Sequence, residues 1–466
     1  MRTRSVSWRS LFVAALAFSF ALVSLPLKAE DLAFHEVGAR AAALGGAFTG
    51  KADDITAIFY NPAGLAFLRG VSLKTNLLVD YRTVSAYSPE FATTFKSSPR
   101  EYLQNIFVAW QPVKRIGLGL GYFSPFGFET QWGSGSWAWR EVNFASWLRS
   151  YCLRSVLSVE VVDGLALSAA LDIVSTSVRW HHSIPFELGN YTLPSKTLTF
   201  SHQELKGHGV GFTASALWKV IPALQIGARY QKSAAVDLAG RNTFSNSIEY
   251  QYDSVPDPIL AYRTVGSLLD MFFVTQPVTG RVTLPQELAC GIALTPIPKL
   301  SLYLDVVWDR WSEFGSWEFR SVNTNDTLAP GFTPLYQEFW GVTPNYGVQS
   351  TPLVLQDTRK FKAGVEFRPS RLFAVRAGFA HHESSVKSAD LSPLYPDAGR
   401  NFFSAGGGYD GPIFSPYEED TPIGYLAFDL FIRLSSADKA PSTFPGLEMT
   451  YGGTRWDAGV GVGFRF

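Results

Sequence analysis

Along most of this chain, hydrophobic and polar residues alternate at every second position. In Trp456–Phe466 the even positions are apolar and the odd positions are Gly, Asp or Arg. The segments Leu300–Trp308, Leu224–Tyr230 and Phe373–Phe379 follow the same period. A period of two over about ten residues predicts β-strands with one apolar face, as in membrane-spanning strands. A soluble β-sandwich also alternates, so this pattern alone leaves both architectures open.

The connections between the alternating segments favour a barrel. Short turns are expected at 111–115, 160–164, 220–223, 296–299 and 369–372. They alternate with long polar and aromatic segments at about 83–100, 125–146, 181–203, 238–281, 312–358, 386–400 and 436–446. Outer-membrane barrels have short turns on the periplasmic side and long loops outside. Residues 410–422 fit poorly, because they should form a short turn but are long and acidic.

Fourteen strands fit between these connections, and an even count returns both ends of a barrel to the periplasm. Their expected bounds are 71–82, 101–110, 116–124, 147–159, 165–180, 204–219, 224–237, 282–295, 300–311, 359–368, 373–385, 401–409, 423–435 and 447–466. The expected fold is therefore all-β, a 14-stranded antiparallel transmembrane β-barrel over residues 71–466. The aromatic last residue, Phe466, is typical of barrels that a dedicated insertion machinery places in the membrane.

Residues 1–29 have the pattern of a secretory signal peptide. Three arginines precede an apolar run at Leu11–Val23, and small residues close the segment near Ala29. The run is short for a membrane-spanning helix, which needs about 20 apolar residues. We therefore expect export and cleavage, and localisation in the outer membrane of a Gram-negative bacterium.

Residues 30–70 are expected to form an N-terminal hatch, or plug, inside the barrel. The stretch Gly38–Leu65 is rich in Gly and Ala and has too few large apolar side chains for a core of its own. Small residues let one backbone pack closely against another wall. Asn61, Pro62, Ala63 and Gly64 form an Asn-Pro-Ala-Gly turn near the end of this stretch.

The third expected strand carries a run of glycines on one face. Gly117, Gly119 and Gly121 point inward, and Pro125 and Gly127 follow directly. One interpretation is that these glycines let the plug pack closely. The other is a bend or gap in the wall, through which an apolar ligand leaves sideways into the membrane. The residues leave both open.

Charged residues on the lumen face are candidates for ligand binding. Arg229, Lys362 and Arg376 are the basic residues that could hold a ligand carboxylate. The alternative is that they form salt bridges within the wall and contacts with the plug.

At several places the sequence resembles the FadL/TodX-type outer-membrane transporters of long-chain fatty acids and other hydrophobic compounds. The matching motifs are Asn61-Pro62-Ala63, Leu284-Pro285 with Gly291 and Trp308, Trp311-Ser312, Asp357-Thr358, Gly364-Val365-Glu366, Arg376-Ala377-Gly378, Pro396-Asp397 with Arg400, and Gly406 to Tyr409. The resemblance extends from about Gly38 to Phe466. It implies a 14-stranded barrel plugged by the hatch, with an apolar pocket. It also implies release through a side opening at the kinked third strand when the hatch moves, with Asn61, Pro62, Ala63 and Gly64 as the gating turn.

Other chemistry has little support in the sequence. Gly45–Lys51 has the spacing of a phosphate-binding loop, but Ala52 stands where Ser or Thr would bind magnesium. Adjacent histidines, as in His181-His182 and His381-His382, point to opposite faces of a strand and rarely share one metal. No hydrolase motif occurs, so we expect neither an enzyme nor a cofactor or metal.

Charge and cysteine content indicate which kinds of binding partner and covalent cross-link to expect. Lys and Arg together equal Asp and Glu in number, which gives no support to nucleic-acid binding. The only cysteines, Cys152 and Cys290, leave a single disulfide open. The expected partners are a hydrophobic small molecule, outer-membrane lipid or lipopolysaccharide, and the barrel-insertion machinery, with the barrel itself a monomer.

The expected function is passive uptake of hydrophobic compounds such as long-chain fatty acids. The alternatives are an aromatic-hydrocarbon channel of the same type, a polar-solute porin, an outer-membrane lipase or protease, and a purely structural or adhesive barrel.

Overall fold

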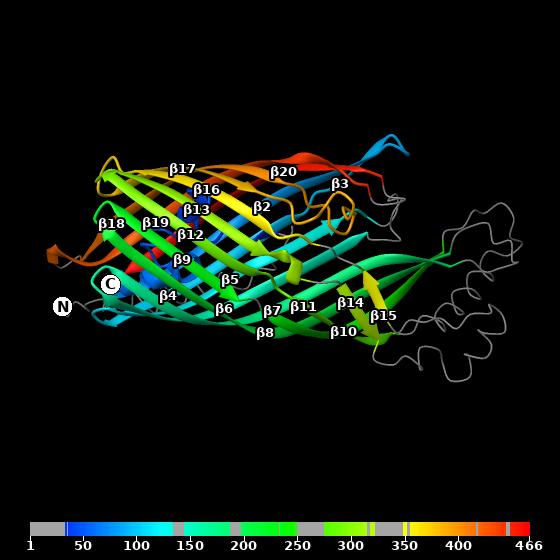
Figure 1. The fold of residues 1–466 in the computed structure, drawn as a ribbon, viewed down its shortest axis with the longest axis horizontal. Helices are drawn as coiled ribbons and strands as arrows, with labels where there is room; N and C mark the ends of the chain where they lie inside the picture. Colours follow the sequence, from blue (N-terminus) through cyan, green and yellow to red (C-terminus); the bar gives the residue numbers. More distant parts are fainter. Residues whose placement is uncertain are drawn as a thin grey trace, which may run out of the picture.

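The computed structural model describes residues 33–34, 36–133, 144–186, 197–232, 234–248, 275–314, 317–321, 348–351, 355–415, 418–443 and 448–466. They form one antiparallel sheet that closes into a long barrel (Figure 1). The signal-peptide prediction for residues 1–29 lies outside the described residues.

Within the described residues, the wall consists of fourteen barrel strands, as predicted. They are β2 (Val71–Ser88), β4 (Arg100–Val113), β5 (Ile116–Gln131), β6 (Ala145–Val162), β7 (Leu165–Phe186), β8 (Thr197–Ile221), β9 (Leu224–Lys232) with β10 (Ala235–Ile248), β11 (Gln276–Thr283) with β12 (Gln286–Ile297), β13 (Leu300–Arg310), β16 (Thr358–Phe367), β17 (Phe373–His382), β18 (Arg400–Ser415), β19 (Glu418–Pro441) and β20 (Thr450–Arg465). β9 and β10 together occupy the place of one barrel strand, with a short break between them, and so do β11 and β12. The short strands β3 (Thr93–Ser97), β14 (Trp317–Ser321) and β15 (Val348–Thr351) extend the sheet at the end with the long connections.

The barrel closes where its first and last strands pair. β2 pairs with β20 from Ser72 opposite Arg465 to Tyr87 opposite Thr450. The backbone of Val71 and Phe466 forms a reciprocal pair of hydrogen bonds of 3.0 and 2.8 Å. Closure removes the free sheet edges, which a membrane does not tolerate because it offers no hydrogen-bonding partner.

The outer surface is apolar and the lumen side is polar, which decides between a barrel and a soluble sandwich. On β13, Leu302, Leu304 and Trp308 are exposed, whereas Ser301 and Asp305 are buried. A soluble sandwich has the reverse arrangement, because its apolar faces meet in the core. Among the described residues, no helix is long and apolar enough to cross a membrane.

The hatch lies inside the barrel and is buried almost throughout. It contains α2 (Ala39–Ala43), α3 (Ala57–Tyr60) and the 3-10 helix η2 (Pro62–Phe67). α2 packs against β17–β20, and η2 packs against β5–β8. Hatch residues such as Phe48 and Ile58 belong to the same apolar core as wall residues such as Phe107. At its start, β1 (Ala33–Phe34) pairs with β5.

The poorly fitting connection at 410–422 is a hairpin rather than a short turn. β18 and β19 continue past their neighbours, because β17 pairs only as far as Tyr409 and β20 only from Tyr425. The two strands pair with each other up to Ser415 opposite Glu418. This hairpin protrudes at the short-turn end of the barrel (Figure 1). The expected strand ends at 409 and 423 were wrong, because we treated polar residues as the end of a strand.

Candidate functional site

The Asn-Pro-Ala-Gly turn attaches the hatch to the barrel wall. The side-chain amide of Asn61, which is fully buried, donates to the carbonyl oxygens of Thr49 (2.9 Å) and Ala216 on β8 (3.0 Å). The backbone N–H of Ala63 donates to Ser215 Oγ (2.9 Å), and its carbonyl accepts from Ser158 Oγ (2.9 Å). One short turn therefore bonds to both β6 and β8. Its gating role stays a prediction.

Pro62 and Gly64 explain the rest of the motif. Pro62 opens η2 at a position where its missing N–H is not needed, and Asn61 Oδ1 accepts from the Ala63 N–H as a cap. A Cβ at Gly64 would lie 2.2 Å from the carbonyl oxygen of Ala52. A side chain there would push η2 away from the loop at Ala52 and from Ala57 of α3.

The glycines of β5 let the hatch contact the wall. A Cβ at Gly117 would lie 2.5 Å from the carbonyl oxygen of Leu65, and one at Gly121 would lie 2.7 Å from Ile58. Gly119 likewise faces Leu65 and Ile58. These three glycines therefore serve the close packing of the plug.

The bend in β5 comes just after these glycines. β4 and β5 pair only as far as Ile106 opposite Tyr122, although both strands continue beyond that point. The pairing of β5 with β6 shifts between Phe123 and Phe126, where β5 has one extra residue. Residues 123–128, which include Pro125 and Gly127, are all buried, so the alternation of inner and outer faces stops. β5 thus turns into the lumen and leaves a seam beside β4.

The N-terminal segment occupies part of the edge of β5 that this bend exposes. Ala33 pairs with Gly127 and Phe34 pairs with Phe126, in place of partners on β4. The start of the hatch therefore contacts the seam directly. Sequence periodicity did not indicate this strand, because two residues carry no pattern.

The inner side of the bend borders an apolar interior. A small pocket here is lined mainly by apolar residues such as Pro125, Phe126, Val174 and Leu284, and Asp172 and Lys232 also border it. The ring of Phe126 packs on Trp311 with centroids 5.2 Å apart. Aromatic and aliphatic walls of this kind suit an apolar ligand.

The long connection at 386–400 is buried to a degree that its polar composition did not indicate. Within 386–400, Leu391, Leu394 and Tyr395 are at most 1% exposed. Trp132 Nε1 donates to the carbonyl oxygen of Pro393 (2.9 Å), and the rings of Phe128 and Tyr395 lie 5.0 Å apart. The long connection is where it was expected, but its apolar residues pack against the bent end of β5 and leave little of it exposed.

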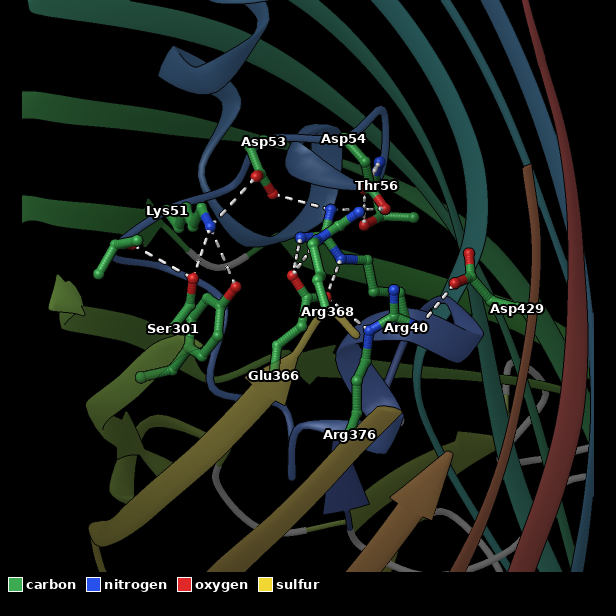
Figure 2. A network of polar contacts seen from close by, with 12 residues as sticks. Arg40, Lys51, Asp53, Asp54, Thr56, Ser301, Glu366, Arg368, Arg376 and Asp429 are labelled. Carbon is green, nitrogen blue, oxygen red and sulfur yellow. Dashed lines mark hydrogen bonds and ion pairs between the residues drawn. The ribbon is translucent and has the colours of Figure 1, made fainter. Parts of the chain in front are cut away.

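A ring of ion pairs, part of which Figure 2 shows, ties the hatch to the wall and closes through Arg40 and Asp54, whose side chains are 3.8 Å apart. On one side Arg40 of the hatch contacts Asp53 (2.8 Å) and Glu366 on β16 (3.1 Å). Glu366 contacts Arg376 on β17 (2.6 Å), which contacts Asp429 on β19 (2.7 Å).

Lys74 on β2 completes this ring. It contacts Asp429 (2.8 Å) and returns to the hatch at Asp54 (3.2 Å). Burial opposes the charge on Asp54, but the nearby Lys74 and Arg40 outweigh it and lower the pKa of this carboxyl. Asp53 behaves in the same way, because burial is outweighed by Arg40 and Lys51, and its pKa is lowered too. A pocket of about 100 Å³ borders the ring.

Each predicted carboxylate-binding residue already has a protein carboxylate as partner. Arg229 pairs with Glu287, Lys362 pairs with Glu36 (2.7 Å), and Arg376 belongs to the ring. Ligand binding by these three residues stays a prediction, and their pairing does not favour it. The geometry fits the alternative, in which they join the wall and the plug.

Sequence reasoning missed Arg154 on β6. Its guanidinium is fully buried, pairs with Asp172 (2.7 Å) and donates to the carbonyl oxygens of Ile58 and Phe59 at the end of α3. A basic residue on the lumen face of a predicted strand was the only available signal.

The sites that we had set aside stay without a function here. Gly45–Lys51, which has the spacing of a phosphate-binding loop, lies in the buried hatch. Among the described residues, no group of three or more His, Cys, Asp or Glu is placed to hold a metal. Cys152 is buried and Cys290 is exposed, and both thiols are free.

Comparisons with known proteins agree with this geometry. The profile of the family described as "Outer membrane protein transport protein (OMPP1/FadL/TodX)" matches residues 22–426. A protein of Neisseria meningitidis serogroup B, named as the outer membrane protein NMB0088, is 22% identical over 422 residues, which cover 84% of this chain and 85% of that protein.

Two solved structures share the fold. A Pseudomonas aeruginosa FadL homologue has a TM-score of 0.71 at 18% identity, covering 95% of this chain and 99% of that one. The Pseudomonas putida toluene transporter TodX has a TM-score of 0.67 at 17% identity, covering 93% and 99%. The plugged barrel, its apolar exterior and the family match agree. The chain therefore belongs to the OMPP1/FadL/TodX family and is a non-enzymatic outer-membrane channel for hydrophobic compounds.

Proposed function

We propose that this channel takes up long-chain fatty acids or similar lipids and releases them sideways into the membrane at the bend of β5. The seam beside β4 is the observation that carries this proposal. Beyond Ile106 and Tyr122 the two strands no longer pair, and the bent part of β5 borders a small, mainly apolar pocket. A ligand that leaves here goes from one apolar environment to another and never crosses water.

Hatch movement is proposed as the gating step. Backbone groups along an open seam need partners, because lipid supplies none. β1 supplies some of them at Phe126 and Gly127. Displacement of the hatch, whose turn at Asn61–Gly64 bonds to the wall, removes β1 from the edge of β5 and opens the seam.

Aromatic hydrocarbons are the second candidate ligands. Phe126, Phe128 and Tyr395 line the spaces on either side of the bend, and aromatic rings stack well on such residues. TodX, which shares the fold, is a toluene transporter. Competition between labelled oleate and unlabelled toluene distinguishes the two. Oleate uptake that toluene abolishes at low concentration would favour the aromatic ligand.

Deletion of Pro125 tests lateral release. The bulge has one extra residue on β5, so this deletion lets β5 continue in register with β6 and pair again with β4. Uptake of labelled oleate by cells without a transporter of their own should then fall to background. The matched control is Pro125→Ala, which keeps the extra residue and should retain most uptake.

Heat-modifiable mobility on a gel checks that both variants form barrels. If the deletion variant forms a barrel and still imports oleate at the wild-type rate, lateral release at β5 is wrong.

A further inference from the structure

On the outer face of β6, β7, β8 and β10, the apolar residues end and basic residues begin. Leu153 on β6, Ile173 on β7 and Val210 on β8 are exposed and lie side by side in the sheet. Toward the end with the long connections, outward positions are occupied by four basic residues. We call this set the basic patch: Arg149, Arg179, Lys206 and Arg241.

The strand register makes these residues neighbours. Arg149 lies opposite Ser177, and Ser177 lies opposite Lys206. Adjacent strands are about 4.8 Å apart, so the backbones of Arg149 and Lys206 are roughly 10 Å apart. Within the same group, Trp147 lies opposite Arg179, and Glu204 lies opposite Arg241.

Acidic residues neutralise only part of this charge. Glu204 pairs with Arg179 at 2.7 Å. Among the described residues, Arg149, Lys206 and Arg241 have no ion-pair partner, and Nε of Arg149 is buried without a hydrogen bond. Arg149 and Arg179 both lie over the ring of Trp147, at 5.1 and 4.7 Å from its centroid.

Two outward arginines elsewhere near this boundary, by contrast, have carboxylate partners. Arg310, at the end of β13, contacts Glu313 at 3.2 Å. Arg359, on β16, contacts Glu383 at 3.0 Å. The basic patch differs from these two positions, because on β6, β8 and β10 it gathers three cations without a carboxylate partner among the described residues.

We propose that the basic patch binds the phosphate groups of a phosphorylated glycolipid in the outer leaflet. The patch lies directly beyond the lipid-facing residues, at the level where lipid headgroups begin. Aromatic residues such as Trp147 and Tyr151 are typical of this interface. A guanidinium binds phosphate through two parallel hydrogen bonds, and a buried unsatisfied Nε gains a partner when an anion arrives. A protein partner is less favoured, because the apolar residues alongside face lipid.

The test uses the purified full-length mature protein in detergent, titrated with bisphosphorylated lipid A and measured by native mass spectrometry. The double variant Arg149→Gln/Arg241→Gln removes two patch cations. The matched control is Arg310→Gln/Arg359→Gln, which removes two outward arginines that have carboxylate partners. A cation near an anionic lipid surface changes binding roughly fivefold, so the patch variant should bind about tenfold or more weakly. The control should bind like the wild type.

Two further arms identify the source of the phosphate. Dephosphorylated lipid A should bind weakly to the wild type, and millimolar inorganic phosphate should not displace the bisphosphorylated form. Equal affinities of the two double variants, or equal binding of dephosphorylated lipid A, would overturn the proposal. Displacement by inorganic phosphate would assign the patch to free phosphate and also overturn it. If the double variant fails to form a barrel, Lys206→Gln alone provides the comparison.

Discussion

Single side chains hold the hatch in the barrel. Asn61 bonds to Thr49 within the hatch and to Ala216 on the wall, and Arg154 bonds to the carbonyls at the end of α3. Buried carbonyl oxygens that lose such donors have no water to replace them. The stability of the plug therefore depends on a few polar residues and not only on its small, tightly packed side chains.

Replacing Asn61 should loosen the hatch. Asn61→Ala leaves the carbonyls of Thr49 and Ala216 without this donor, at a cost of about 1–3 kcal/mol. Hydrogen–deuterium exchange of residues 44–66 should become faster. Asn242→Ala is the control, because Asn242 is a buried wall residue that bonds to Ser201 and not to the hatch. Equal hatch exchange in both variants would contradict the anchoring role.

The ring of ion pairs should respond to acid in one direction. The pKa of Asp54 is lowered below its usual 3.8, so its ion pair contributes stability above that value and loses it only as pH falls through the lowered pKa. Resistance of the hatch to an acid protease should stay constant from about pH 7 to pH 5 and decrease only below about pH 4. In Asp54→Asn the acid step should be smaller. A decrease that begins near pH 6 would point to histidines instead.

At the scale of elements, the bend of β5 and the hatch are one assembly. The glycines of β5 contact Leu65 and Ile58, and the bent part of the same strand pairs with β1. The segment around Tyr395 then packs on the far end of the bend. A displacement of the hatch therefore acts on the same strand whose bend forms the seam.

A disulfide between the hatch and the wall should block uptake. Ala63→Cys with Ser215→Cys joins two positions that already touch, since the Ala63 N–H donates to Ser215 Oγ at 2.9 Å. With Cys152 and Cys290 replaced by Ser, oxidised cells should lose oleate uptake and recover it with reductant. Each single cysteine variant is the control. Full uptake with the disulfide formed would show that this end of the hatch does not move.

At the scale of the whole molecule, the barrel is a closed wall around a filled lumen. The apolar exterior suits lipid, whereas the interior combines the hatch, the buried segment at 386–400 and buried ion pairs. An open aqueous pore is the arrangement of a polar-solute porin, and this lumen differs from it.

Ion conductance follows from that filled lumen. The wild-type protein in a planar bilayer should pass little steady current, because the hatch blocks the path. Deletion of residues 36–68 should produce large, stable channels, and a deletion within the 410–422 hairpin should not. Large channels in the wild type would contradict the plugged state.

Much of the architecture was predictable because it depends on local pattern. The two-residue period of the segments between Val71 and Phe466 predicted fourteen barrel strands with an apolar outer face. The small residues of Gly38–Leu65 predicted a plug. Each of these follows from neighbouring residues and the geometry of a strand.

The tertiary structure alone decided which distant residues meet. Three contacts join segments that are far apart in the sequence. Arg229 pairs with Glu287, β1 pairs with β5, and the buried Tyr395 packs on Phe128. Alternation along a strand predicts which face of the wall a side chain lies on. It does not predict which carboxylate each cation in the lumen pairs with. The partner of each cation depends on barrel closure and on the path of the hatch, and neither of these is a local property of the chain.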